Sequence, residues 1–230
     1  MKKVGFIGVY DKTDMILNLA KILTILGNKV LMIDSTVNQK AKYVVPSINP
    51  TTSYITNFED IDVAIGFENE KQIKEYLGLT TEDLPYDILL VDADNYSRIK
   101  EYKLDKALKN FFVTSFDLYS LRKGLEIFAD IEKPMSLTKI LYSKEILKED
   151  DDYLNFLSSN YKVVWENDRI YFPIENGDHE VLMENQRVAK IKFKRLSAQY
   201  KDSLVYIVLG ILNTSEMNVR RAIKTIEKGV

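Results

Sequence analysis

The chain has 230 residues, of which 46% are hydrophobic and 29% are charged, so it can bury one substantial core of single-domain size. It has no cysteine and one histidine, which excludes a disulfide framework and argues against a structural metal site. The net charge of -2 gives no overall attraction to nucleic acid or anionic lipid. Because we find neither a membrane span nor a signal-peptide core, we expect a cytoplasmic protein.

The first part of the sequence predicts a strand, a helix and a second strand. Residues 3–9 are β-branched and apolar and lead into a polar loop, as a buried strand does. From Thr13, apolar residues recur every three or four positions until Gly27, which favours a helix with a glycine C-cap. Residues 29–33 are again apolar and end at Asp34. This order is the βαβ unit of a parallel sheet.

The rest of the chain continues this alternation. Residues 37–52 hold two prolines and predict an irregular segment, whereas residues 87–91 predict a strand that delivers Asp92 at its carboxyl end. Other expected strands lie at 54–56, 63–66, 111–116, 137–143 and 170–172, and other expected helices at 68–77, 118–128, 147–161 and around 189–212. No repeat or linker marks a boundary. We therefore expect a single domain over 1–230, of the α/β class, with a three-layer, doubly wound and mostly parallel sheet.

The segment DKTDMILNLAKILTILGNKVLMID, Asp11 to Asp34, resembles the ParA/MinD-type P-loop ATPases of the SIMIBI class. In that family a phosphate-loop G-K-T leads into a helix with N-L-A and then L-G-x-K-V-L-x-I-D, and the match has no gap. Residues 86–94, YDILLVDAD, resemble the Walker B strand, and residues 111–128 resemble a later strand and helix. The resemblance implies a P-loop NTPase-like fold.

The resemblance also implies a nucleotide site. Lys12 matches the phosphate-contacting lysine, Thr13 matches the magnesium-binding hydroxyl, and Asp92 matches the terminal acid of the Walker B strand. If ATP or ADP binds, Thr13 and Asp92 would hold the magnesium ion. The full set of expected cofactor-binding positions is Gly8, Asp11, Lys12, Thr13, Asp34 and Asp92.

The sequence departs from the family pattern at positions that matter for hydrolysis. Val9 and Asp11 stand where the phosphate loop has glycines, and we expect Asp11 to become the partner of Lys12. Ile7 replaces the signature lysine that reaches across the family's dimer, and Thr36 replaces an acid that helps to activate water. Phosphoryl transfer depends on placed charges and backbone donors, so these losses together should cost several decades in rate. We therefore expect a degenerate ATPase with no catalytic residue.

Three functions stay open. The first is a positioning, assembly or partition scaffold that binds nucleotide weakly or not at all. It would form a homodimer, bind a protein partner of a plasmid, pilus, secretion or division apparatus, and lie in the cytoplasm or peripherally at a membrane or pole. TadZ-like pilus-assembly proteins are the nearest kind. The second is an active ParA/MinD-type ATPase that cycles between monomer and ATP-bound dimer. The third is a regulatory subunit that binds a nucleotide or dinucleotide without turnover.

Other features have a plain structural explanation beside a functional one. The basic run 190–195 offers contacts to DNA phosphates, but its interleaved apolar residues favour a solvated basic face. Residues 214–230 have few bulky apolar side chains for a membrane-binding tail, and favour a packed last helix. The acidic run Glu149–Asp152 favours a helix N-terminus, and we expect His179 in an exposed turn. DNA or membrane contact is therefore not our primary expectation.

Overall fold

The structure of the chain is a computed structural model that describes residues 1–46, 52–80, 83–143, 148–174 and 176–229. Its strands are β1 (Lys2–Ile7), β2 (Val30–Asp34), β3 (Tyr54–Phe58), β4 (Ile61–Ile65), β5 (Ile88–Ala93), β6 (Lys109–Ser115), β7 (Met135–Ser143) and β8 (Val163–Pro173). Its helices are α1 (Thr13–Ile25), α2 (Ala41–Val44), α3 (Glu70–Tyr76), α4 (Tyr96–Glu101), the short 3₁₀ helix η1 (Leu104–Lys106), α5 (Leu118–Glu126), α6 (Lys148–Ser158), α7 (Asn176–Arg187), α8 (Ala198–Ile211) and α9 (Glu216–Glu227).

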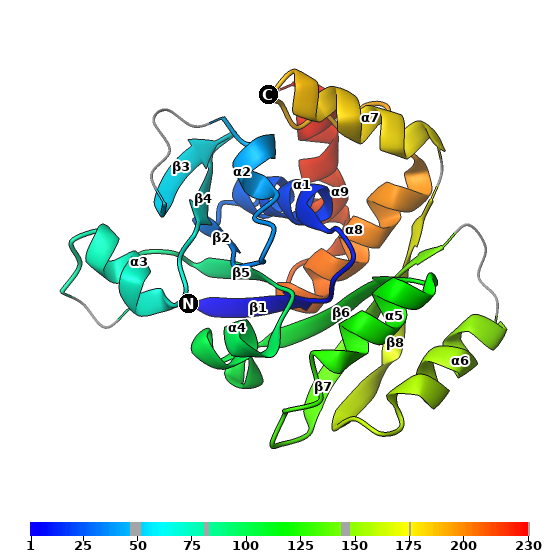
Figure 1. Cartoon of the computed structure of the whole chain (residues 1–230). Helices are drawn as coiled ribbons and strands as arrows, with labels where there is room; N and C mark the ends of the chain where they lie inside the picture. Colours follow the sequence, from blue (N-terminus) through cyan, green and yellow to red (C-terminus); the bar gives the residue numbers. More distant parts are fainter. Residues whose placement is uncertain (47–51, 81–82, 144–147, 175, 230) are drawn as a thin grey trace.

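The described strands form one sheet in the order β3-β4-β2-β5-β1-β6-β7-β8. Only the β3–β4 pair is antiparallel within this described sheet; the other neighbouring pairs are parallel. Helices cover both faces, which gives three layers (Figure 1). The predicted α/β class with a mostly parallel sheet is therefore confirmed. Because β1, β2, β5 and β6 run in the same direction, their carboxyl ends lie along one edge of the sheet.

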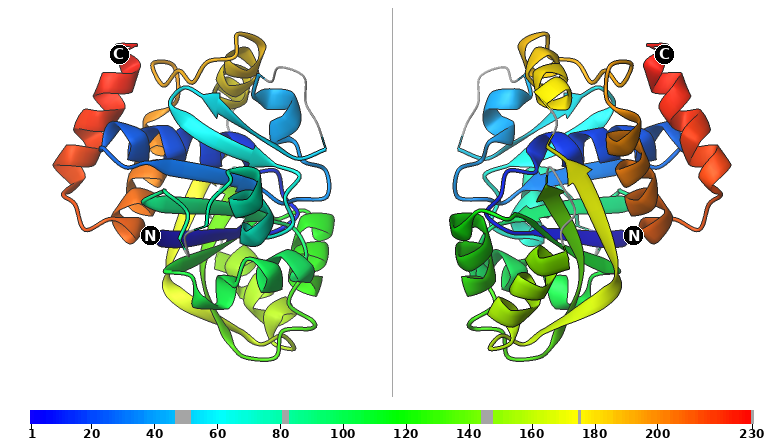
Figure 2. Two further views of the ribbon diagram at one scale, coloured as in Figure 1. Left: turned by 90° about the vertical axis from the view of Figure 1, so that its left-hand side faces the viewer. Right: turned by 90° about the vertical axis from the view of Figure 1, so that its right-hand side faces the viewer.

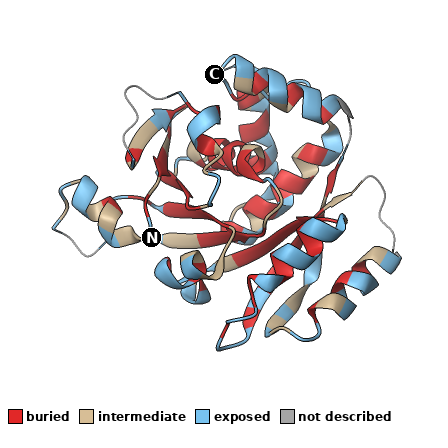
Figure 3. Cartoon of the chain, in the orientation of Figure 1, coloured by how far each residue is buried: buried red, intermediate tan, exposed pale blue. Residues whose placement is uncertain are grey.

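Each face of the sheet buries its own apolar cluster. The α1, α8 and α9 helices pack on one face, and α3, α4, α5 and α6 supply the helical side chains of the other. The central strands β1, β2 and β5 are covered on both faces, which explains why most of their residues are apolar. Figure 3 shows the buried residues concentrated in these strands and in α1.

The first helix ends as the sequence predicts. Gly27 has a φ of +86°, a left-handed conformation that glycine adopts without steric cost. Its N–H donates to the Thr24 carbonyl, and the Asn28 N–H donates to the Leu23 carbonyl at 3.1 Å. These two bonds are the Schellman pattern, which satisfies carbonyls at the helix end and turns the chain into β2.

The last helix is packed on the domain, as the sequence predicts. Val219, Ala222, Ile223 and Ile226 of α9 are buried, and the helix contacts α1 and α8 (Figure 2). Its apolar stripe is thus covered by protein. In the part of the chain that the structure describes, no helix is long and apolar enough to cross a membrane.

The predicted helix around 189–212 is wrong in its first third. The structure has α7 at Asn176–Arg187, a non-helical segment at 188–197, and α8 from Ala198. Within that segment Ile191 and Phe193 are buried while the lysines between and beside them are exposed, which is a period of two and not of a helix. The predicted solvated basic face is therefore confirmed, on extended chain.

Two further boundaries differ from the prediction. His179 is exposed, as expected, but it lies in the first turn of α7 and not in a turn between elements. Strand β8 begins at Val163, well before the predicted residue 170, because the polar residues 166–169 separate its apolar start from the predicted segment. The acidic run 149–152 does lie in the first turns of α6, as predicted.

Candidate functional site

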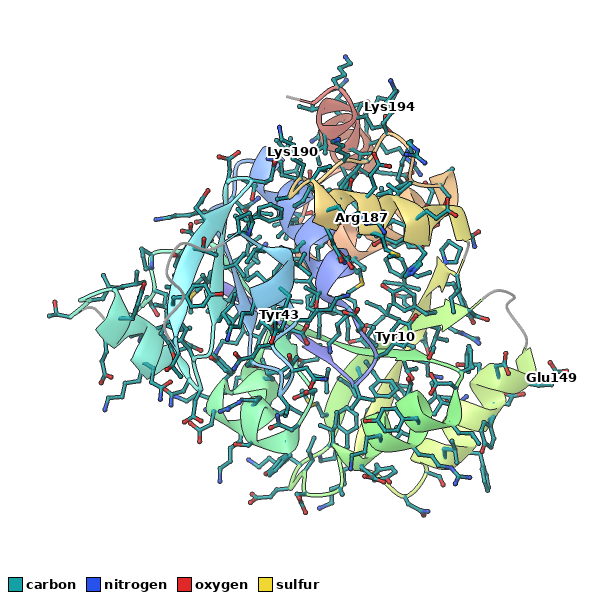
Figure 4. The ribbon with its side chains drawn as sticks, turned by 45° about the horizontal axis from the view of Figure 1, so that its top comes forward. Tyr10, Tyr43, Glu149, Arg187, Lys190 and Lys194 are labelled. Carbon is teal, nitrogen blue, oxygen red and sulfur yellow. The ribbon has the colours of Figure 1, made fainter. Side chains whose placement is uncertain are left out.

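A cavity of about 280 Å³ opens at the carboxyl edge of the sheet, between the β1–α1 loop, the β2–α2 loop and the end of β5. Five of the six predicted cofactor-binding residues line it, and the sixth, Asp34, does not. The full lining is Gly8, Val9, Tyr10, Asp11, Lys12, Thr13, Thr36, Asn38, Lys40, Tyr43, Asp92 and Asp94. Tyr10 and Tyr43 mark this region in Figure 4. The sequence therefore located the cavity but missed several of its walls.

Lys12 lies at the base of the cavity and already has partners. Its Nζ donates to the Gly8 carbonyl at 2.7 Å and lies 2.7 Å from Oδ1 of Asp92 as an ion pair. The prediction that Asp11 pairs with Lys12 is wrong. Asp92 reaches Lys12 because β5 pairs with β1 in a register that sets Asp92 opposite Phe6, two residues before Gly8. The lysine is thus neutralised from within the fold.

Burial makes the Asp92 carboxyl harder to ionise. Burial raises the pKa of this carboxyl to about 7; Lys12 opposes the rise, and the nearby charge of Asp34 adds to it. Asp92 and Asp34 are direct neighbours in the β2–β5 pairing. Near neutral pH, Asp92 is therefore close to the pH at which it gains or loses its proton.

Asp11 pairs with groups other than Lys12. Its Oδ1 accepts the Thr13 N–H at 3.1 Å, which satisfies a free donor at the start of α1, and its Oδ2 pairs with Lys40. Lys40 also lies 3.5 Å from Asp14. Both carboxylate oxygens of Asp14 accept hydrogen bonds from Nε2 of Gln186 in α7. Asp11 thus joins a small polar network beside the cavity.

Asp34 is fully buried behind the cavity and organises the next loop. Its Oδ1 accepts the Thr36 N–H at 3.1 Å and the Thr36 hydroxyl at 2.6 Å, and its Oδ2 accepts the Ala41 N–H at 2.9 Å. Thr36, which stands where the family pattern named in the sequence analysis has an acid, is therefore engaged with Asp34. The role of Asp34 in this structure is to fix the β2–α2 loop.

Gly8 is required by the backbone packing alone. Its φ is +146°, and a Cβ at this position would lie 2.1 Å from the Val113 carbonyl oxygen of β6. Any side chain would force β1 and β6 apart. Gly8 therefore serves the sheet, whether or not a nucleotide uses the loop.

A second cavity of about 590 Å³ adjoins the first and shares Tyr10, Asp11 and Lys40 with it. Aromatic rings form one wall: the Tyr10 and Tyr142 centroids lie 4.7 Å apart, and Tyr142 stacks on Phe172 at 5.1 Å. Residues of α7 also line this cavity. No local sequence pattern predicts this cavity, because its walls come from five segments that are distant in the sequence: residues 10–15, Lys40, Tyr142, residues 173–186 and Tyr200.

No protein-family model matches the sequence, and no curated protein matches it. Solved structures do. A putative plasmid partition protein from Borrelia burgdorferi bound to AMPPNP has a TM-score of 0.58 at 13% identity, over 92% of this chain and 99% of that one. A ParA family ATPase from Chlorobium tepidum has a TM-score of 0.54 at 14% identity, over 96% and 98% of the two chains. A chain of the MinC:MinD cell division complex from Aquifex aeolicus has a TM-score of 0.55 at 12% identity, over 94% of this chain and 98% of that one.

This is the fold of the ParA/MinD-type P-loop ATPases. The match extends over nearly the whole chain, including the last hundred residues, where the sequence predicted the fold only by its general alternation. At this low identity the likeness concerns the fold, and the site must be judged from its own residues.

The residues present fit the phosphate end of a nucleotide in part. Lys12, Thr13 and Asp92 converge on one cavity near the lower size limit of small-molecule pockets. The lining also carries Asp11 and Asp94, so its carboxylates outnumber its two lysines. Among the described residues no group of His, Asp or Glu side chains could hold a metal ion by itself. A magnesium ion would therefore need phosphate oxygens to complete its ligands.

Proposed function

We propose that this chain is a positioning or partition protein of the ParA/MinD type that binds magnesium-ATP or ADP weakly and hydrolyses ATP slowly or not at all. The observation that carries the proposal is the state of Lys12, which lies in the phosphate cavity but is neutralised by Asp92 and bonded to the Gly8 carbonyl. An incoming phosphate has to compete with both partners. Affinity should therefore be modest.

The residues that would hold the nucleotide follow from the cavity. Lys12 and the backbone N–H groups of residues 9–12 would meet the phosphates, and Thr13 and Asp92 would meet the magnesium ion. The larger neighbouring cavity, with its wall of tyrosines, gives room for the nucleoside. ATP would supply a hydrolysable phosphoanhydride.

Slow turnover follows from what surrounds this cavity. The hydroxyl of Thr36 donates to Asp34, and a neutral threonine has no carboxylate with which to orient or activate water. Ile7, at the position of the family's signature lysine, is fully buried in β1 and cannot reach a second subunit. The charges that accelerate phosphoryl transfer are therefore absent at both positions.

Function would then depend on contacts with other proteins. Exposed apolar side chains lie on the carboxyl edge of the sheet, in the β2–α2 region and at the start of α5: Val37, Tyr43, Leu118 and Tyr119. A group of this kind is typical of a protein-binding surface. We propose that it forms the face of a homodimer, and that a protein partner of a plasmid, pilus, secretion or division apparatus binds that dimer.

The test is a titration of the purified protein with magnesium-ATP and ADP up to the millimolar range, by calorimetry and by size exclusion with light scattering. We expect weak binding that Lys12→Ala abolishes, with phosphate release near the background rate. ATP-dependent dimerisation with steady turnover would instead establish the active ATPase. Tight nucleotide binding that Lys12→Ala abolishes, without turnover or dimerisation, would favour the regulatory subunit.

A further inference from the structure

Lys40 is the second lysine of the phosphate cavity, and it differs from Lys12 in being accessible. Its side chain is 37% exposed, whereas that of Lys12 is 2% exposed. It lines both adjoining cavities, as Tyr10 and Asp11 do, so its side chain borders the region that they share. A ligand that occupies both cavities would lie close to this charge.

The loop that carries Lys40 is held in place from both ends. Asp34 binds the N–H groups of Thr36 and Ala41, which lie on either side of the loop. The Val37 N–H donates to Asp94 at 2.9 Å, which ties the loop to the end of β5. Lys40 therefore approaches the cavity from a backbone that is already positioned, so little ordering is needed for it to act on a ligand.

The present partners of Lys40 are the two carboxylates that border the cavity mouth. Lys40 pairs with Asp11 and lies 3.5 Å from Asp14. Burial alone would lower the pKa of Lys40, but its hydrogen bonds and charge contacts with Asp11 and Asp14 raise it, so the ammonium group stays charged. Without that charge, Asp11 would repel any phosphate that reaches Lys12.

We propose that Lys40 is a phosphate-binding residue that acts within its own subunit, with Asp11 as its counter-ion when no nucleotide is bound. On binding, its ammonium group would exchange a carboxylate for phosphate oxygens, as a compact charge on a flexible stem can do. In this way one chain regains the second cation that it lacks at Ile7. The inference rests on the nucleotide site of the proposed function.

The test compares Lys40→Ala with Lys42→Ala, which removes the same charge from an exposed position of α2. We expect Lys40→Ala to weaken magnesium-ATP binding at least tenfold, and Lys42→Ala to change it less than twofold. Inorganic tripolyphosphate, used as a second probe, should lose affinity by the same factor as ATP, because the contact is with phosphate. Melting curves check that each variant is folded.

Asp11→Asn is the complementary variant. It should raise the affinity for tripolyphosphate when Lys40 is present and raise it less in the Lys40→Ala background, because the two side chains act as a pair. Binding by the wild type that is lost in Lys12→Ala but kept in Lys40→Ala overturns the role of Lys40 and leaves the nucleotide site standing. No binding of either probe by the wild type or by Asp11→Asn overturns both.

Discussion

Two buried lysine–aspartate pairs in this molecule have similar geometry but different surroundings. Lys12 lies 2.7 Å from Asp92 at the carboxyl edge of the sheet, and Lys139 of β7 lies 2.6 Å from Asp151 of α6. All four side chains are at least nine-tenths buried. Figure 1 shows α6 well away from the β1–α1 loop, so the two pairs are independent.

The Lys139 pair is completed by its neighbours. Lys139 also donates to Asn155 at 2.6 Å and lies 5.0 Å from the Trp165 ring centre, and Arg169 donates to the second oxygen of Asp151 at 2.6 Å. The Lys12 pair has one further bond, to a backbone carbonyl, and borders a cavity. A buried pair with all its partners stabilises a fold, whereas one with few partners is kept at a cost and is available to a ligand.

The largest expected effect is on the free energy of unfolding when each lysine becomes methionine, which keeps the length of the side chain and removes the charge. Lys139→Met should cost about 3–5 kcal/mol, because it breaks a buried network. Lys12→Met should cost much less at pH 7, because Asp92 can take up a proton and become neutral. Urea denaturation of both variants measures the difference. Equal costs would mean that the two pairs have the same role.

The second expected effect is on the pH dependence of stability in Asp92→Asn. The pKa of Asp92 is raised from 3.8 to about 7 on folding, so its contribution is fully present below pH 4 and is lost as pH rises through 7. At about 1.4 kcal/mol per pKa unit, the loss is up to about 4 kcal/mol. The asparagine variant does not ionise, so it should match the wild type at pH 4 and exceed its stability at pH 8.

Asp151→Asn is the matched control for that experiment. Its carboxylate has two cationic partners, so replacing it should destabilise the fold at both pH values. Thermal or urea unfolding at pH 4 and pH 8 separates the two variants. A lower stability of Asp92→Asn at pH 8 would show that the Lys12 pair stabilises the fold after all.

The same comparison explains what the sequence could predict. The β1–α1–β2 unit, the strand before Asp92 and the place of the cavity follow from local patterns, because each lies in one continuous segment. The partner of Lys12 was mistaken because adjacency in sequence favours Asp11, while the strand register that brings Asp92 to the lysine is a property of the whole sheet. Lys139–Asp151 was missed for the same reason, since its members lie on separate elements.

The failure to predict α7 has a different cause. The start of α7 contains Asn176 and Gly177, which are typical of turns, and its mean character is polar. What stabilises it is tertiary: Asp178 accepts both the N–H and the hydroxyl of Ser197, and Gln186 donates to Asp14 of α1. Contacts of this kind override local propensity and leave no periodic signal in the segment itself.

The smallest expected effect concerns Arg169, which completes the Asp151 pair from a side chain that is almost half exposed. Because solvent and salt screen such a group, Arg169→Ala should cost only about 0.5–1 kcal/mol in unfolding free energy. In 0.5 M salt this cost should shrink, while the cost of Lys139→Met should persist, because that pair is buried. Arg122→Ala, an exposed arginine of α5, gives the baseline. If Arg169→Ala lowers the unfolding free energy as much as Lys139→Met at either salt concentration, Arg169 is the main structural partner of Asp151. The Lys139–Asp151 pair would then stabilise the fold no more than the Lys12–Asp92 pair does.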